Sequence, residues 1–440
     1  MSLGAKIRYQ FMVNLTGRAA LAFSRQRAEK RLRSGEARPP YGRPLKSSAR
    51  LKELISRHYL CGRYARGARP VAWVTSGAPV EFLLALGFHL HYPENHGAVC
   101  GIRRRAEELC RLAESQGFSP HLCSYARTDF GLVAGGRSPA GRISPPDFLL
   151  CCNNICQTVL YWYQVLAHKF RVPLVVIDTP FLYQPAEEHQ IDYVKKQLEQ
   201  AIEPAEKAAG RRLRFSELQR VARLSKEAVE LWGRVLATAR RRPAPFLAFD
   251  AFIHMAPIVE MRGETFTVDY YRQLLEELEE RAQAGQGALL EERYRLVWDN
   301  LPIWFSMRKL ADWLAERGVA LVASTYTTAW SELEPLMDPE RPLESGARVY
   351  LHALLNRSTG EKLRAMEKLA RDFSADGVIL HSDRSCKPYS LGQMDQRLRL
   401  AGKLKTPALL LEADHNDPRA WDENQAFKRL ESFLELLDKR

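Results

Sequence analysis

Short apolar runs alternate with amphipathic stretches in two separate parts of the chain. In the first part, VAWV, DFLLCC and PLVVI are each followed by a polar turn and then by a stretch with helical periodicity. The runs YRLVWD, GVALVAS, DGVILHS and PALLLEA have the same context in the second part. Apolar strands that alternate with amphipathic helices indicate parallel strands joined by crossover helices. The pattern therefore predicts an α/β fold with two Rossmann- or flavodoxin-like parallel-sheet domains.

Between and before these two parts the pattern is helical. The segment YYRQLLEELEERAQAG, for example, carries charges four residues apart, and such pairs support a helix. The first residues of the chain have a basic, helical pattern without strands. We predict a basic helical N-terminal extension at 1–45, a first α/β domain at 46–187, a mainly helical segment at 188–300 and a second α/β domain at 301–440.

The net charge of +13 is concentrated at the N-terminus. Residues 1–50 hold twelve lysines and arginines but only two acidic residues, so the rest of the chain is nearly balanced. We interpret the excess as a solvated arm or docking surface and do not expect nucleic-acid binding, because no groove-reading motif accompanies the charge. No run approaches the ~18 apolar residues of a membrane span, and the N-terminus lacks a secretory signal pattern. The expected location is the cytoplasm.

Eight cysteines are distributed unevenly along the chain. Seven lie within the first 156 residues, and the eighth, Cys386, is separated from them by 230 residues. A disulfide framework is not expected in a long cytosolic chain, and no CxxC pair has zinc-finger spacing. Cys61 and Cys110 fall on helix faces, where a buried core role is an equal alternative. Cysteines that act together must therefore be brought together by the fold.

Unusual residues follow several of the predicted strands. Ser76 follows VAWV, Glu94 follows HLHYP, Cys156 follows DFLLCC, Asp178 follows PLVVI and Cys386 follows DGVILHS. In open α/β sheets, ligands bind beyond the carboxyl ends of the strands. This shared placement predicts a functional site built from the loops after the strands.

Cys156 and Cys386 also stand where helices are predicted to begin. Helix N-termini stabilise a thiolate, and Arg384 and Lys387 add positive charge near Cys386. Such a thiolate serves as a nucleophile, a redox group or a metal ligand. Cys123, in the polar segment SPHLCSYARTDFG, is a third cysteine in such a setting. Three thiolates suit an iron–sulfur cluster or zinc and leave one metal corner open.

Six segments resemble motifs of the 2-hydroxyacyl-CoA dehydratase and benzoyl-CoA reductase family. They are VAWVTSGAPVE, YPENHGAVCG, CSYARTDFG, NNICQT, RSCKPYSLGQ and NDPRAW, and they occur in the family's order over residues 45–440. The chain is most similar to the larger dehydratase subunit, the D-component type, which carries a catalytic cluster. The resemblance implies an oxygen-sensitive [4Fe–4S] cluster held by Cys123, Cys156 and Cys386, with the fourth corner open to water or substrate.

The resemblance also implies a reaction and its partners. Dehydratases of the family convert an (R)-2-hydroxyacyl-CoA into a 2-enoyl-CoA and water. They work with a second homologous subunit and receive one electron from an ATP-dependent activator that carries its own [4Fe–4S] cluster. That electron makes a ketyl radical anion of the acyl-CoA substrate, which expels the 2-hydroxyl, and the electron is returned after the β-proton leaves. We therefore expect a lyase subunit that uses radical chemistry in anaerobic metabolism.

Two further positions match family positions that are proposed to contact the substrate. Glu94 is the candidate acid/base, because loss of a β-proton needs a base and loss of a hydroxyl needs a proton donor. Ser76 is the candidate hydrogen-bond donor. The alternatives are a helix cap or ion pair for Glu94 and a turn residue for Ser76. His96 is considered as a second proton carrier, and Asn153 and Asn154 are expected to fix the loop after DFLLCC.

Other functions stay open at this point. A benzoyl-CoA reductase subunit would share the fold and the cluster but would keep the electrons in its product. A branch with a double-cubane cluster would reduce small molecules and use more ligands, for which Cys100, Cys151 and Cys152 are candidates. A cluster-bearing electron-transfer or scaffold subunit would not be an enzyme. If a cluster is present, Arg384 and Lys387 are expected to offset its negative charge.

Overall fold

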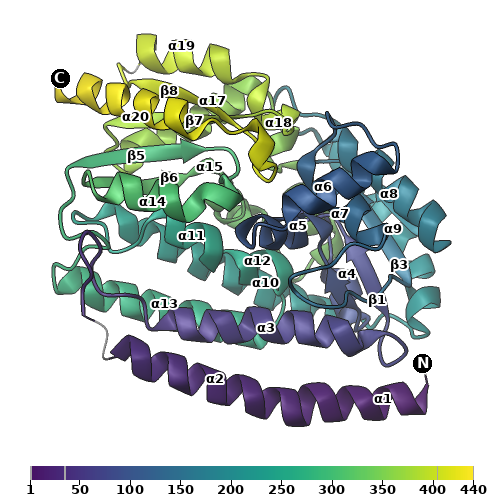
Figure 1. Cartoon of the computed structure of the whole chain (residues 1–440). Helices are drawn as coiled ribbons and strands as arrows, with labels where there is room; N and C mark the ends of the chain where they lie inside the picture. Colours follow the sequence, from purple (N-terminus) through teal and green to yellow (C-terminus); the bar gives the residue numbers. More distant parts are fainter. Residues whose placement is uncertain (1, 34–35, 404, 440) are drawn as a thin grey trace.

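The computed structural model describes residues 2–33, 36–403 and 405–439. Within these residues the strands form two four-stranded sheets, and every neighbouring pair of strands is parallel (Figure 1). The strand order is β2-β1-β3-β4 in one sheet and β6-β5-β7-β8 in the other. The predicted α/β fold with two parallel sheets is confirmed. The strands are β1 (Val71–Val74), β2 (His89–His91), β3 (Phe148–Cys152), β4 (Leu174–Ile177), β5 (Tyr294–Asp299), β6 (Val319–Ser324), β7 (Gly377–Asp383) and β8 (Ala408–Ala413).

Helices cover both faces of the first sheet, which is why its strands are continuous apolar runs. Trp73 and Leu149 pack on the face that carries α7 and α8, whereas Val74 and Leu150 pack on the face that carries α4, α9 (Glu188–Ala209) and α10 (Phe215–Ala237). The helices of this part are α3 (Ser47–Ala65), α4 (Glu81–Ala85), α5 (Pro93–Ile102), α6 (Ala106–Ser115), α7 (Ser124–Val133) and α8 (Gln157–Phe170).

The second sheet is buried in the same way. Leu296 and Ile379 pack with α14 and α20, and Val297 and Val378 pack with α17 and α19 on the opposite face. The elements around this sheet are α14 (Met307–Ala315), α15 (Thr325–Thr328), α16 (Pro342–Leu351), α17 (Thr359–Asp372), α18 (Lys387–Ser390), α19 (Gln393–Lys403), α20 (Glu423–Asp438) and the 3₁₀ turns η3 (Trp304–Ser306), η4 (Ser331–Leu336), η5 (Leu354–Asn356) and η6 (Pro418–Ala420).

Helices dominate the segment between the two sheets, as expected. However, β5 lies inside the predicted helical range 188–300 and pairs with β6 and β7, so the second sheet begins before residue 301. The other predicted boundaries stay predictions. The helices of this segment are α9 (Glu188–Ala209), α10 (Phe215–Ala237), α11 (Ala248–His254), α12 (Ala256–Glu260) and α13 (Thr265–Gln283), with the 3₁₀ turn η2 (Thr238–Arg240).

The N-terminal extension forms one long helical rod that runs beside α3 (Figure 1). It consists of α1 (Leu3–Tyr9), a π-helical turn η1 (Gln10–Leu15) and α2 (Thr16–Arg33), which confirms its predicted helical character. Among the described helices, none combines the length and the apolar character that a membrane crossing requires.

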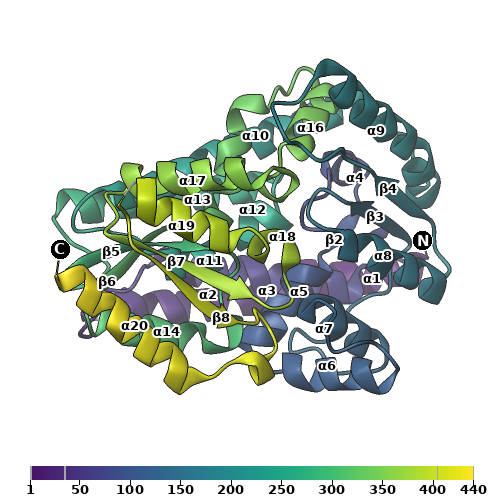
Figure 2. The same cartoon turned by 90° about the horizontal axis from the view of Figure 1, so that it is seen from above.

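In both sheets the strand order reverses at a central strand, so that consecutive strands are added first on one side of it and then on the other. β2 and β3 lie on opposite sides of β1, and β6 and β7 lie on opposite sides of β5. Ligands of open α/β proteins bind at such switch points, beyond the carboxyl ends of the strands. Figure 2 shows the two sheets on either side of α5 and α18, and these two short helices follow strand ends of opposite sheets.

Candidate functional site

Loops that follow strands of both sheets contribute to the lining of one cavity of about 190 Å³. The cavity therefore combines the switch points of the two sheets, which is the position expected for a ligand site. Of the strand-end residues, Asp178 does not line the cavity and accepts a hydrogen bond from the Tyr193 hydroxyl at 2.8 Å. All five candidate site residues do line it: Ser76, Glu94, Cys123, Cys156 and Cys386.

Each of the three cavity cysteines is the N-cap residue of a helix. Cys123 precedes α7, Cys156 precedes α8 and Cys386 precedes α18, so the helix starts predicted at Cys156 and Cys386 are confirmed. The free backbone N–H groups of a helix start point toward its N-cap residue and give it a positive environment. Because the three helices belong to different parts of the fold, only the complete chain brings the three thiols to one cavity.

The two asparagines of the Cys156 loop fix that loop, as expected. The side-chain amide of Asn154 donates to the carbonyl of Gly77 at 2.9 Å and to that of Tyr350 at 2.8 Å. Asn153 Oδ1 accepts from the backbone N–H and the hydroxyl of Thr179, at 2.7 and 2.8 Å. These bonds tie the loop after β3 to the loop after β1, to the loop after β4 and to α16.

Burial and the helix starts have opposite effects on the pKa values of the cavity thiols. Burial, followed by the nearby Cys123, raises the pKa of Cys156 to about 12, and the backbone N–H groups of Val159 and Thr158 offset this only in part. Burial, nearby Asp383 and the other two cavity cysteines also raise the pKa of Cys386 well above its ordinary value. Burial and the neighbouring thiols thus oppose the effect of the helix starts on these two pKa values, and the expected thiolates stay a prediction. A bound cation would reverse this balance.

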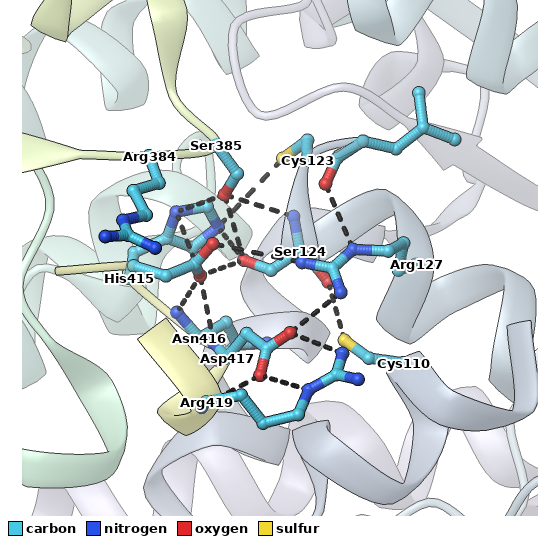
Figure 3. Close-up of polar contacts among 12 residues, drawn as sticks. Cys110, Cys123, Ser124, Arg127, Arg384, Ser385, His415, Asn416, Asp417 and Arg419 are labelled. Carbon is cyan, nitrogen blue, oxygen red and sulfur yellow. Dashed lines mark hydrogen bonds and ion pairs between the residues drawn. The ribbon is translucent and has the colours of Figure 1, made fainter. Parts of the chain in front are cut away.

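A buried hydrogen-bond network connects two of the cysteine loops (Figure 3). His415, in the loop after β8, has its Nδ1 atom 2.6 Å from Asp383 Oδ2. Its Nε2 atom lies 2.9 Å from Ser124 Oγ and 4.0 Å from Cys123 Sγ. Asp383 also accepts the backbone N–H of Cys386 at 3.3 Å. The pair of His415 and Asp383 thus joins the Cys123 loop to the Cys386 loop.

His415 and Asp383 form an oppositely charged pair within this network. Burial lowers the pKa of His415, but Asp383 and Asp414 together raise it well above its ordinary value, so the ring carries a positive charge. The pKa of Asp383 shifts oppositely, to about 2, because the effect of His415 exceeds that of burial. The ligand atoms of these three residues lie close enough to hold a metal ion. Since they already bond to one another and to backbone N–H groups, we interpret them as a structural network.

Arg384 and Lys387, which were expected to face a cluster, do not line the cavity. The Arg384 guanidinium donates to Glu412 at 2.7 Å on the surface, and the Lys387 ammonium donates to the Arg384 carbonyl. The cationic side chain that lines the cavity beside the cysteines is His415.

A second buried group holds α7 against the loop after β8 (Figure 3). Arg127 Nη1 lies 2.7 Å from both Glu114 Oε1 and Asp417 Oδ2. Arg419 binds the same two carboxylates, each at 2.6 Å. Because Cys123 is the N-cap of α7, these ion pairs also fix the position of its backbone.

Glu94 is a buried carboxyl in the first turn of α5. Its Oε1 atom accepts the backbone N–H of Ser76 at 3.1 Å, whereas its Oε2 atom is buried without a hydrogen-bond partner. Burial raises the pKa of Glu94 to about 7, and Asp129 contributes in the same direction. Such a pKa suits proton transfer at neutral pH. The Ser76 hydroxyl donates to Asn95 Oδ1 at 2.7 Å and would have to turn to reach a substrate.

The other residues considered for the site lie away from the cavity. The thiols of Cys100, Cys151 and Cys152 are buried in the protein core and do not line it. His96 is also buried outside it, with Nε2 2.8 Å from Ser138 Oγ. Burial lowers the pKa of His96 to about 4, so the ring is neutral near pH 7.

Two parts of the site were not identified from the sequence. His415 stands directly after the run PALLLEAD, so the rule that placed the other residues at strand ends would have identified it. The second part is an apolar wall, which includes side chains on or next to α12, η4 and α16 and has no local sequence signature. We define this wall as Met255, Val259, Trp330, Leu333 and Val349.

A fully buried arginine supports the apolar wall from behind. Arg262 Nε lies 3.0 Å from Glu81 Oε1, and its Nη2 atom donates to the Tyr350 hydroxyl at 2.7 Å. The remaining contacts are to the carbonyls of Ala78 at 2.9 Å and Val259 at 3.0 Å. The guanidinium thereby joins α4, α12 and α16.

Replacing Arg262 with methionine is expected to lower the free energy of unfolding by about 3 kcal/mol, because Glu81 loses its buried partner. Urea unfolding of the full chain, followed by circular dichroism, measures this change. The matched control is Arg272→Met, which breaks the exposed pair with Glu227 and is expected to cost less than about 1 kcal/mol. Equal effects of the two changes would contradict the anchoring role of Arg262.

Comparison with known proteins agrees with the motifs. A family model described as 2-hydroxyglutaryl-CoA dehydratase, D-component, matches residues 75–437. The (R)-2-hydroxyisocaproyl-CoA dehydratase alpha subunit of Clostridioides difficile is 33% identical over 394 residues, which cover 89% of this chain and 96% of the relative. The (R)-phenyllactyl-CoA dehydratase alpha subunit of Clostridium sporogenes is 30% identical over 374 residues, covering 83% and 89%.

A benzoyl-CoA reductase subunit of Thauera aromatica is also similar, with 28% identity over 410 residues that cover 90% of this chain and 95% of the relative. The family model covers every described strand except β1 and includes every cavity-lining candidate residue. The family resemblance inferred from the six motifs is therefore confirmed. The chain belongs to the 2-hydroxyglutaryl-CoA dehydratase, D-component, family.

Proposed function

We propose that the chain is the iron–sulfur subunit of an (R)-2-hydroxyacyl-CoA dehydratase, which eliminates water from a 2-hydroxyacyl-CoA to give a 2-enoyl-CoA. The observation that carries the proposal is the convergence of three N-capping cysteines and a buried carboxyl of raised pKa on one cavity. The similarity to the dehydratase alpha subunits of C. difficile and C. sporogenes supports the choice of reaction.

The donor set of the cavity fits a [4Fe–4S] cluster. Cys123, Cys156 and Cys386 supply three sulfurs from three separate loops. The raised pKa values of Cys156 and Cys386 reflect, besides burial, a mutual repulsion that iron would relieve. A bound cluster would supply a Lewis-acidic iron corner and one-electron reduction of the thioester. His415 lies beside Cys123 and provides a positive charge for an anionic group.

Glu94 is proposed to move the protons of the reaction. In its acid form it donates a proton to the leaving 2-hydroxyl, so that the C2–O bond breaks and water departs. Its carboxylate then accepts the proton from C3 as the double bond forms, which restores the acid form. Ser76, after its hydroxyl turns away from Asn95, is proposed to donate a hydrogen bond to the substrate.

The proposal includes three partners. The substrate is an acyl-CoA, a second homologous subunit completes the enzyme, and an ATP-dependent activator with its own [4Fe–4S] cluster delivers the electron. The names of the relatives as alpha subunits support the second subunit. Because the electron returns after each turnover, ATP use should be catalytic.

A benzoyl-CoA reductase is the second candidate, supported by the similarity to the Thauera aromatica subunit. A double-cubane cluster has less support, because Cys100, Cys151 and Cys152 lie away from the cavity.

The test uses the anaerobically purified complex with its activator and ATP. We expect a 2-hydroxyacyl-CoA to lose the mass of one water, with many turnovers per ATP consumed, and benzoyl-CoA to remain unchanged. Reduction of benzoyl-CoA with ATP use in proportion to product would favour the reductase. If a complex with full iron content catalyses neither dehydration nor reduction, both enzyme proposals are contradicted.

A further inference from the structure

The cavity has two chemically different ends. One end carries the cysteines, Glu94 and His415, which the proposed function uses. The other end is the apolar wall together with the ring of Tyr350, which pack in a different hydrophobic cluster from the three cysteines. Among the described residues, neither a lysine nor an arginine lines either end. A thioester whose carbonyl lies at the cysteine end would place its acyl side chain against the apolar wall.

The arginine nearest to this wall is not available to a ligand. Arg262 donates to Glu81, to Tyr350 and to two backbone carbonyls, so four of its five N–H donors are already used. Its guanidinium carbon lies 4.4 Å from the centre of the Trp330 ring. The cavity is therefore lined by the rings that cover Arg262, while Arg262 itself does not line it.

This arrangement selects against a charged acyl group. A carboxylate buried at the apolar wall would lose its hydration without gaining a cation, which is strongly unfavourable. An aliphatic or aromatic side chain would gain from burial of apolar surface and from contact with the aromatic rings.

We propose that the substrate is the CoA thioester of a 2-hydroxy acid with an uncharged, apolar side chain, aliphatic or aromatic, and that dicarboxylic acyl groups are excluded. This proposal rests on the proposed function for the orientation of the thioester. The specificity-determining residues are those of the apolar wall. Met255 is its flexible side chain, and Trp330 is its aromatic side chain.

Binding of non-hydroxylated thioesters tests the proposal without turnover. Isocaproyl-CoA, 3-phenylpropionyl-CoA, glutaryl-CoA and free CoA are titrated calorimetrically into the anaerobic, iron-loaded complex. We expect glutaryl-CoA to bind at least about 30-fold more weakly than the two apolar thioesters. Glutaryl-CoA that binds as tightly as isocaproyl-CoA, or apolar thioesters that bind no better than free CoA, would overturn the proposal.

Met255→Arg introduces the missing cation on a side chain of similar length. It is expected to weaken isocaproyl-CoA binding at least about 10-fold and to reduce or reverse the discrimination against glutaryl-CoA. Met394→Arg makes the same charge change at an exposed position and should leave both affinities unchanged. If Met255→Arg does not fold, Val349→Ala should weaken isocaproyl-CoA binding about 3-fold, and an unchanged affinity would count against the wall.

Failure of this inference can be distinguished from failure of the proposed function. Preference for apolar thioesters in a complex that forms no enoyl-CoA would contradict dehydration but support the acyl pocket. Dehydration of 2-hydroxyglutaryl-CoA in preference to 2-hydroxyisocaproyl-CoA would support the reaction and overturn the pocket.

Discussion

The Cys386→Ala variant is expected to lose nearly all the iron of the anaerobically purified protein, from about four per chain to less than about 0.5. The cavity would retain only Cys123 and Cys156. Two of the three proposed cysteine ligands are not enough to hold a cluster. Metal-binding free energy also stabilises the fold around its ligands. Iron and sulfide analysis, the visible absorption of the cluster and dehydration by the complex should all decrease together.

The matched control is Cys61→Ala, which removes a partly buried thiol on α3 outside the cavity. Its iron content and activity should equal those of the unchanged protein. Cys151→Ala adds a test of cluster size, because about four irons should remain if Cys151 is only a core residue. Retention of full iron by Cys386→Ala would show that the three cavity cysteines are not the ligand set.

The fold and much of the site could be predicted because they leave local signals. Buried parallel strands are short apolar runs, and the rule for ligand sites at strand ends selected Ser76, Glu94, Cys156 and Cys386. These four line the cavity, whereas Asp178, which the same rule selected, does not. The boundary predicted near 300 stays a prediction, and the run YRLVWD, which the pattern already grouped with the strands of the second part, pairs with β6 and β7.

Features that depend on surroundings could not be predicted. The helix start at Cys156 is visible in the sequence, whereas the burial that raises the pKa of this thiol is a property of the packed cavity. Arg384 is close to Cys386 in sequence, but its side chain pairs with Glu412 on β8, and this pairing follows from the sheet. The apolar wall combines separate elements, so only the folded chain reveals it.

The second large effect is expected at Glu94. The Glu94→Gln variant should reduce dehydration about 10³-fold while keeping full iron content, because the amide cannot exchange the protons of the 2-hydroxyl and C3. The unchanged enzyme should lose activity as the pH rises above about 7, where Glu94 loses its proton. The pH profile of kcat/KM, measured with the activator in excess, should contain this limb, and the residual activity of Glu94→Gln should lack it.

The same substitution should stabilise the protein at neutral pH. Since the pKa of Glu94 is raised from 4.5 to about 7 in the folded protein, the unfolded chain releases this proton first as the pH rises. Folding stability contributed by Glu94 is therefore complete below pH 4.5 and declines up to about pH 7. Glutamine removes this dependence, so the stability gain should be near zero at about pH 4.5 and at most about 3 kcal/mol at about pH 8.

Asp129→Asn is the control that separates burial from catalysis. Asp129 is also a fully buried carboxyl whose pKa burial raises to about 7, and it accepts a hydrogen bond from Trp162, but it does not line the cavity. Both substitutions should therefore stabilise the protein above about pH 7, and only Glu94→Gln should abolish dehydration. Equal loss of activity in both variants would mean that the buried carboxyls of α5 and α7 affect activity through the fold and not through proton transfer by Glu94. A carboxyl that is kept at the cavity despite its cost to stability is best explained by proton transfer to a substrate.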